Sequence, residues 1–92
     1  MSLSKYYSGD MVWEDLAALY LETWMQCPFK SDLLNAVNGD QKLAATIYGS
    51  HGSSAMEWLD RSVPALDGRT PRGCLATPEG ELSLRECLIR ME

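Results

Sequence analysis

The sequence predicts an all-α fold, a compact single domain of five or six short helices. Apolar residues recur at helical spacing in the two longest predicted helices, residues 11–26 and 78–91. Glycine, proline and helix-capping residues divide the rest of the chain into shorter pieces. No segment shows the alternation of apolar and polar residues that is typical of a β-strand. The chain has 92 residues, 46% of them hydrophobic, which is enough for one core but too few for two.

The first predicted helix is rich in apolar residues. A polar, flexible lead-in over residues 1–9 precedes a single helical domain over 10–92, and Ser8 or Asp10 is placed to cap the helix. Two interpretations remain open: the helix is the central helix of the core, or part of it lies in an interface. The second predicts a homodimer whose interface includes Trp13, Tyr20 and Trp24. The predicted inner face consists of Trp13, Leu16, Ala17, Tyr20, Trp24 and Cys27, and Val12, Leu19 and Leu21 extend the apolar surface beyond it.

Three shorter helices follow, each with its own start and stop signals. Cys27-Pro28 ends the first helix, because the residue before a proline is pushed away from helical geometry. Ser31 is placed to cap a helix over 32–37, which Asn38-Gly39 ends. Asp40 is placed to cap a helix over 41–48, which Gly49 ends. After a loop over 50–53, Ser54 and Glu57 fit a capping box for a helix that reaches about Asp60, and residues 61–69 are irregular.

The pattern Thr-Pro-x-Gly occurs twice, at Thr70 and at Thr77. Threonine is a good N-cap, and proline is favoured at the first helical position, where its missing amide would be unpaired anyway. Each unit therefore predicts a helix start. The first helix, over 71–76, has room for little more than a turn, and the second runs over 78–91. Its apolar stripe consists of Leu84, Cys87, Leu88 and Met91.

The net charge of −5 is unevenly distributed. Residues 1–60 contain three lysines and eight acidic residues, whereas residues 61–92 contain five arginines and five acidic residues. Contacts to phosphates supply most of the non-specific affinity for DNA, so an acidic chain is not expected to bind DNA alone. The arginines are either a recognition surface, since the guanidinium pairs with carboxylates and phosphates, or ordinary solvated charges.

The cysteine and histidine residues show no spacing that is typical of a catalytic or metal-binding site. Cys27, Cys74 and Cys87 are odd in number and lack a Cys-x-x-Cys spacing, which favours buried, reduced thiols of a cytosolic protein over disulfides or a zinc site. The single histidine, His51, is expected to be exposed in a Gly/Ser-rich loop. We therefore expect no catalytic residue, no metal site, no cofactor and no enzymatic activity. We expect no membrane span and no signal peptide either.

The second half of the chain carries an ordered set of residues. It reads Trp58-Leu59, then Pro64-x-Leu66-x-Gly68-x-x-Pro71, then Leu75-x-Thr77-x-x-Gly80, accompanied by Tyr48-Gly49, Ala55, Leu88 and Arg90. With these residues, the region 43–92 resembles the toxin-binding domain of Xre/MbcA/ParS-type antitoxins. The resemblance covers about half of the chain, and the order and spacing of the whole set make it specific.

The resemblance implies a bacterial, cytoplasmic antitoxin of a type II toxin–antitoxin system. Such domains bind and neutralise a RES-domain toxin, an enzyme that acts on NAD as a glycohydrolase or ADP-ribosyltransferase, and they are often dimeric. Many relatives also carry an N-terminal Xre-like DNA-binding domain, for which residues 1–42 are too acidic and too short. Arginine and large apolar residues often dominate binding energy. We expect the toxin to contact Arg69, Arg72, Arg90, Met91 and Glu92.

Alternative interpretations remain open. Arg90 is also placed to act as a cation at a helix C-terminus, where the helix dipole favours it. The chain is alternatively a transcriptional regulator or operon repressor accessory without a toxin-neutralising role. A third interpretation is a small enzyme with Cys74 or Cys87 as nucleophile, which requires a thiol of lowered pKa.

Overall fold

The computed structural model describes residues 7–91, without the side chain of Met91, and it confirms the all-α fold. Within that range the chain forms six α-helices and two short 3₁₀ helices and contains no β-strand. The α-helices are α1 (Asp10–Trp24), α2 (Lys30–Ala36), α3 (Gln41–His51), α4 (Ala55–Leu59), α5 (Pro71–Cys74) and α6 (Pro78–Met91), and the 3₁₀ helices are Gly52–Ser54 and Pro64–Leu66.

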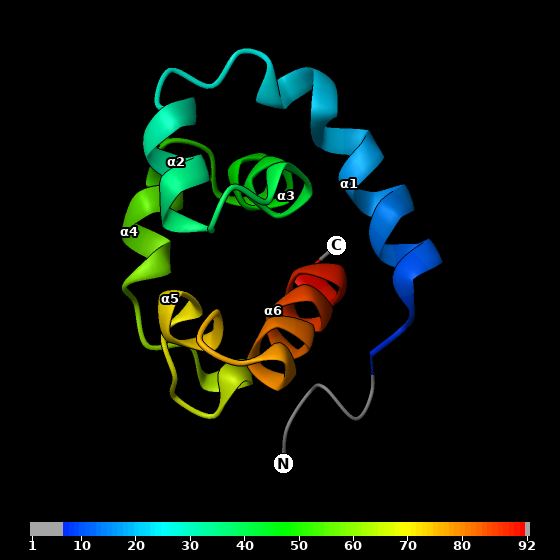
Figure 1. Ribbon diagram of the computed structural model, residues 1–92, viewed down its shortest axis with the longest axis vertical. Helices are drawn as coiled ribbons and strands as arrows, with labels where there is room; N and C mark the ends of the chain where they lie inside the picture. The colour runs from blue at the N-terminus through cyan, green and yellow to red at the C-terminus, as the bar shows by residue number, and fades with distance from the viewer. Residues whose placement is uncertain (1–6, 92) are drawn as a thin grey trace.

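α3 is the central helix of the molecule. Figure 1 shows it nearly end-on with the other helices arranged around it, and it contacts α1, α2, α4 and α6. The five consecutive residues from Leu43 to Ile47 are all 0% exposed. Five residues exceed one helical turn, so α3 is covered on every side there.

α1 packs along one side of α3 and buries one face. Its buried residues are Trp13, Leu16, Ala17 and Trp24, as the helical spacing predicted. The interpretation of this helix as the central helix is wrong, because α3 occupies that place. Among the residues whose side chains the structure describes, the exposed large hydrophobic ones are Met11, Val12, Leu19, Leu21 and Met25, all on α1 or directly after it.

Gly49 lies inside α3 and does not end it, contrary to the prediction. A Cβ atom at Gly49 would collide with the ring of Tyr20, so this glycine permits the close approach of α1 to α3. The helix continues to His51, and Gly52 adopts a left-handed φ of 58° that ends it. The prediction of Asn38-Gly39 as a break is confirmed, since both residues have positive φ after α2.

Three predicted helix caps are confirmed. The Asp40 carboxylate accepts from the Leu43 amide at 3.1 Å, the Thr70 hydroxyl from the Gly73 amide at 3.0 Å, and the Thr77 hydroxyl from the Gly80 amide at 3.0 Å. Each bond satisfies an amide that the first helical turn leaves without a partner. The repeated Thr-Pro unit therefore marks two helix starts, as expected.

Four other predicted caps are wrong. α1 follows Gly9, and Ser8 instead directs its amide and hydroxyl to Glu86, while Asp10 accepts from the Tyr7 hydroxyl. α2 begins one residue before Ser31, which is exposed within the helix. Ser54 ends a 3₁₀ helix with near-helical dihedral angles and makes no side-chain cap bond. In each case a residue type that favours helix capping is present. The helix starts at another position, or the backbone before it has dihedral angles that do not allow the side chain to cap it.

Candidate functional site

The candidate site is built on the short connection through α5. Thr70 and Pro71 start α5, and Thr77 and Pro78 start α6 after an intervening turn. Gly80 lies directly against the backbone of Cys74, and a Cβ atom there would collide with that backbone. The end of α5 is therefore pressed against the first turn of α6, which fixes α5, where Arg72 lies, and the segment with Arg69 just before it.

Arg69 and Arg72 are each held by an acidic residue of another element. Arg69 donates through Nε to the Leu66 carbonyl at 3.0 Å, and its Nη1 lies 3.3 Å from Glu79 Oε2. Arg72 pairs with both carboxylate oxygens of Asp60, at 2.8 and 3.4 Å. This hydrogen bond lowers the pKa of Asp60 and raises the pKa of Arg72. The two guanidinium groups are thus oriented in advance, and Arg72 remains exposed.

Arg90 belongs to the other end of α6. Its Nε donates to Glu86 Oε2 at 2.8 Å, and Glu86 Oε1 accepts from the Ser8 amide and hydroxyl at 2.9 Å each. Burial alone would raise the pKa of Glu86, but the bonds from Arg90 and Ser8 outweigh it and hold that pKa below its usual value. Arg90 therefore neutralises a buried carboxylate near the helix C-terminus.

The five residues predicted to face a toxin do not form one surface. Arg90 lies eleven positions after Glu79, the partner of Arg69, which corresponds to about 16 Å along α6. Arg69 and Arg72 therefore lie together at one end and Arg90 at the other. The side chain of Met91 and the whole of Glu92 lie outside the described residues.

Trp13, Tyr20 and Trp24, predicted to contribute to a homodimer interface, face the inside of the molecule. Trp13 and Trp24 are each 2% exposed, and the half-buried Tyr20 ring packs on Gly49. That prediction is corrected here, because the two tryptophans have almost no surface left for another chain. The most exposed apolar residues of α1 and its C-cap, Met11, Leu19 and Met25, lie away from this buried face.

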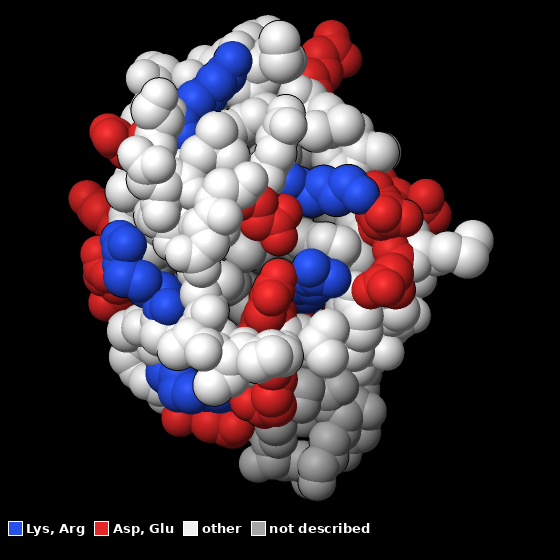
Figure 2. Space-filling model, viewed as in Figure 1, with Lys and Arg blue, Asp and Glu red and all other residues white. Residues whose placement is uncertain are grey.

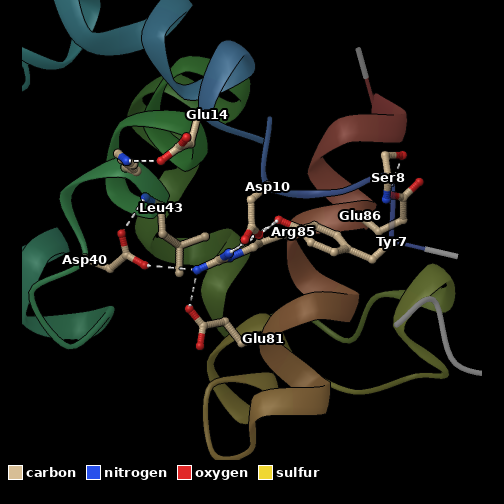
Figure 3. Close-up of polar contacts among 10 residues, drawn as sticks. Tyr7, Ser8, Asp10, Glu14, Asp40, Leu43, Glu81, Arg85 and Glu86 are labelled. Atoms are coloured by element: carbon tan, nitrogen blue, oxygen red, sulfur yellow. Dashed lines mark hydrogen bonds and ion pairs between the residues drawn. The ribbon is translucent and has the colours of Figure 1, made fainter. Parts of the chain in front are cut away.

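The sequence patterns did not reveal the polar cluster around Arg85 (Figure 3). The guanidinium nitrogens of Arg85 lie 3.0 Å from a carboxylate oxygen of Glu81, 3.6 Å from one of Asp10 and 4.0 Å from one of Asp40. Its guanidinium carbon is 5.4 Å from the ring centre of Trp13. Its Nη1 is also 3.4 Å from the Tyr7 hydroxyl. Burial alone would lower the pKa of Arg85, but Tyr7 and Glu81 raise it. The spacing of Glu81 and Arg85 on α6 signals one of these pairs, whereas the others come from distant segments.

Mixed charges surround this cluster on one face of the molecule. Figure 2 shows basic side chains enclosed by acidic ones near the middle of that face. Lys42 pairs with Glu14 at 2.7 Å beside it. The cluster ties the start of α1, the cap of α3 and the middle of α6 together, so we interpret it as a structural element.

The histidine and the three cysteines are packed among other side chains. His51 is the last residue of α3 rather than part of an exposed loop, and its ring stacks on Trp58 at 4.1 Å between ring centres. All three cysteines are buried free thiols, as expected. Burial raises the pKa of Cys74 and of Cys87, which is opposite to the shift that a thiol nucleophile needs.

Residues 7–91 enclose no pocket, and they contain no group of three or more His, Cys, Asp or Glu side chains placed to bind a metal ion. None of the helices in this part of the chain combines the length and hydrophobicity that crossing a lipid bilayer requires. No family model, curated protein or solved structure was found to match the chain.

Proposed function

We propose that this chain is an antitoxin-like binding protein that neutralises a RES-type toxin, an enzyme that consumes NAD or transfers ADP-ribose, in a bacterial type II toxin–antitoxin system. The observation that supports the proposal is the ordered residue set from Trp58 to Gly80. Its apolar members Trp58, Leu59, Leu66 and Pro71 are buried, and its glycine at position 80 allows the close packing of α5 on α6. Several members of the set therefore belong to the packed core of the second half of the chain.

The exposed part of this unit supplies groups suited to protein recognition. Arg72 is exposed and oriented by Asp60, and Arg69 is half-buried and oriented by Leu66 and Glu79. A guanidinium that is already ordered loses less entropy when it binds a carboxylate or a phosphate of a partner. Neutralisation in this proposal is steric and takes place in the cytoplasm, without chemistry by the chain itself.

The decisive experiment is co-expression with the protein encoded by the neighbouring reading frame. We expect that protein to be a RES-type enzyme whose expression alone depletes NAD or stops growth. Co-expression should restore growth, and the two proteins should purify together. The proposal fails if the neighbouring frame encodes no NAD-using enzyme, or if the proteins do not co-purify and toxicity persists. A shift of the chain's own promoter DNA without any partner would favour the regulator interpretation instead.

Substitutions can locate the toxin-binding surface. Arg72→Glu should weaken the complex by about 10-fold or more if Arg72 is a main contact. Arg61→Glu is the matched control, because Arg61 is also exposed and makes no ion pair within the described residues. Equal effects of both substitutions would rule out a specific role for Arg72.

Arg90 needs a different design, because its removal leaves the buried Glu86 without its cation. Deletion of Met91 and Glu92 tests the chain end while Arg90 stays in place. If the helix end approaches the toxin, this deletion should reduce binding, and circular dichroism should show that the shortened chain is still folded. Unchanged binding would remove the chain end from the proposed contact set.

A further inference from the structure

We propose that the outer face of α1 binds a basic amphipathic helix of a partner protein. We define the outer face by the apolar residues Met11, Leu19, Leu21 and Met25 and the carboxylates Asp15 and Glu22. Met11, Leu19 and Met25 are 81%, 73% and 67% exposed, whereas the opposite face of α1 is buried on α3. This helix is therefore apolar on two faces, and the described part of the chain covers only one of them.

The arrangement of the outer face matches the footprint of a helix. Met11, Glu22 and Met25 are separated by 11 and 3 positions, which places them on one stripe of an α-helix. Leu19 and Leu21 lie on either side of that stripe. α1 has 15 residues, which corresponds to about 22 Å and accommodates three to four turns of a second helix. Large apolar side chains exposed along one helix are typical of interaction surfaces, and methionine adapts its shape to a partner.

The charge of α1 is of one sign. The helix contains Asp10, Glu14, Asp15 and Glu22 and neither lysine nor arginine. Arg85 and Lys42 pair with Asp10 and Glu14. Asp15 and Glu22 are exposed, and their carboxylates make no hydrogen bond or ion pair with residues 7–91. Two carboxylates thus remain available within the apolar face.

The negative charge of Asp15 and Glu22 indicates which kind of partner fits the outer face. A second copy of the chain would place the same face against itself across a two-fold axis, so carboxylates would face carboxylates. An anionic lipid surface or a nucleic acid would be repelled in the same way. A helix with an apolar stripe flanked by lysine or arginine satisfies both the apolar residues and Asp15 and Glu22.

The outer face is separate from the surface of the proposed function. Figure 1 shows α1 along one side of the molecule and α5 on the opposite side, with α3 and α6 between them. Toxin binding and the binding of a helix to α1 are therefore independent proposals, and each can be tested without the other. A partner helix on α1 would leave Arg69 and Arg72 accessible.

The test uses the full chain and a synthetic amphipathic peptide with a leucine stripe flanked by lysines. One control peptide carries glutamate in place of lysine, and another has the same composition in scrambled order. Titrations followed by fluorescence anisotropy should show saturable binding of the lysine peptide and much weaker binding of both controls. Leu19→Ser should weaken the lysine peptide about 10-fold, because one buried leucine side chain is lost from the interface.

Charge reversal separates this face from the general acidity of the chain. Asp15→Lys with Glu22→Lys should abolish the preference for the lysine peptide and favour the glutamate peptide. Asp32→Lys with Glu57→Lys is the matched control, since it makes the same change in net charge at exposed positions on α2 and α4. Circular dichroism of every variant should remain that of the native fold, because all four positions are exposed.

Several outcomes would overturn the proposal. They are the absence of saturable binding, an equal effect of the two charge reversals, and binding to vesicles of anionic lipid. Light scattering that shows a dimer in the wild type and a monomer in Leu19→Ser would also overturn it, because a second copy would then cover the face.

Discussion

α1 and α3 contrast within the same core. α1 carries two tryptophans and many leucines, yet it lies at the side of the molecule and leaves one whole face exposed. α3 carries small residues such as Ala44, Ala45 and Thr46, yet it is buried on every side. Small side chains on α3 allow neighbouring helices to approach it from several directions. The size of the side chains, more than their total hydrophobicity, thus distinguishes the central helix from the peripheral one.

The two faces of α1 should differ most in their contribution to stability. Trp13→Ala removes a side chain that is 2% exposed, and we expect a loss of about 3–5 kcal/mol in the free energy of unfolding. Leu19→Ala, on the outer face, should change it by less than about 0.5 kcal/mol. Urea denaturation of both variants measures the difference. Similar losses for the two variants would contradict the assignment of the inner and outer faces.

Replacing an alanine by leucine should lower stability much more in α3 than in α1. Ala45→Leu adds volume where no side chain is exposed, and we expect a loss of about 1–3 kcal/mol from overpacking. Ala18→Leu makes the same substitution on the exposed side of α1 and should stay within about 0.5 kcal/mol of the wild type. Thermal unfolding of the two variants measures this difference in stability. A tolerated leucine at position 45 would mean that α3 is not closely surrounded.

The cluster around Arg85 connects the two helices, because it pairs with Asp10 of α1 and with Asp40, the cap of α3. Arg85→Met keeps much of the apolar stem and removes the charge, and it should cost about 1–2 kcal/mol. Arg61→Met, at an exposed arginine without an ion pair in the described part of the chain, should cost close to nothing. An equally small effect of Arg85→Met in urea denaturation would show that the cluster contributes little to holding α1 on α3.

The smallest expected effect is on the stability of the protein at acidic pH. The hydrogen bonds from Arg90 and Ser8 hold the pKa of Glu86 below 4.5 in the folded chain. A group with a lowered folded pKa contributes stability at pH values above its unfolded pKa, and this contribution is lost as the pH falls through the folded value. Glu86→Gln should therefore flatten the decrease in stability below pH 4.5. A pH series of unfolding midpoints checks it, and an unchanged slope would contradict the role of Glu86.

The sequence predicted the fold class and the borders of several helices because these depend on short-range patterns. The caps at Asp40, Thr70 and Thr77 each use a bond that spans three residues, so a local motif is sufficient. The cap predicted at Ser8 failed for the opposite reason. Its amide and hydroxyl bind Glu86, which is 78 residues away, and no local pattern indicates that competition.

The candidate site was predictable only as a list of residues. The pattern of the second half pointed to Arg69, Arg72 and Arg90, but it could not show that α6 separates them into two ends. It also missed Arg85, because only Glu81 lies within one turn of it, while Tyr7, Asp10 and Asp40 reach it through the packing of α1 and α3.

The sequence by itself determined that this protein is helical, which residues start α3, α5 and α6, and which side chains form the inner face of α1. Periodicity and capping act over a few residues and can be interpreted from one chain. Only the tertiary structure decided which helix is central, which face of α1 stays exposed and which acids surround Arg85. Those features depend on contacts between segments far apart in the sequence, and on the small residues that let these segments approach.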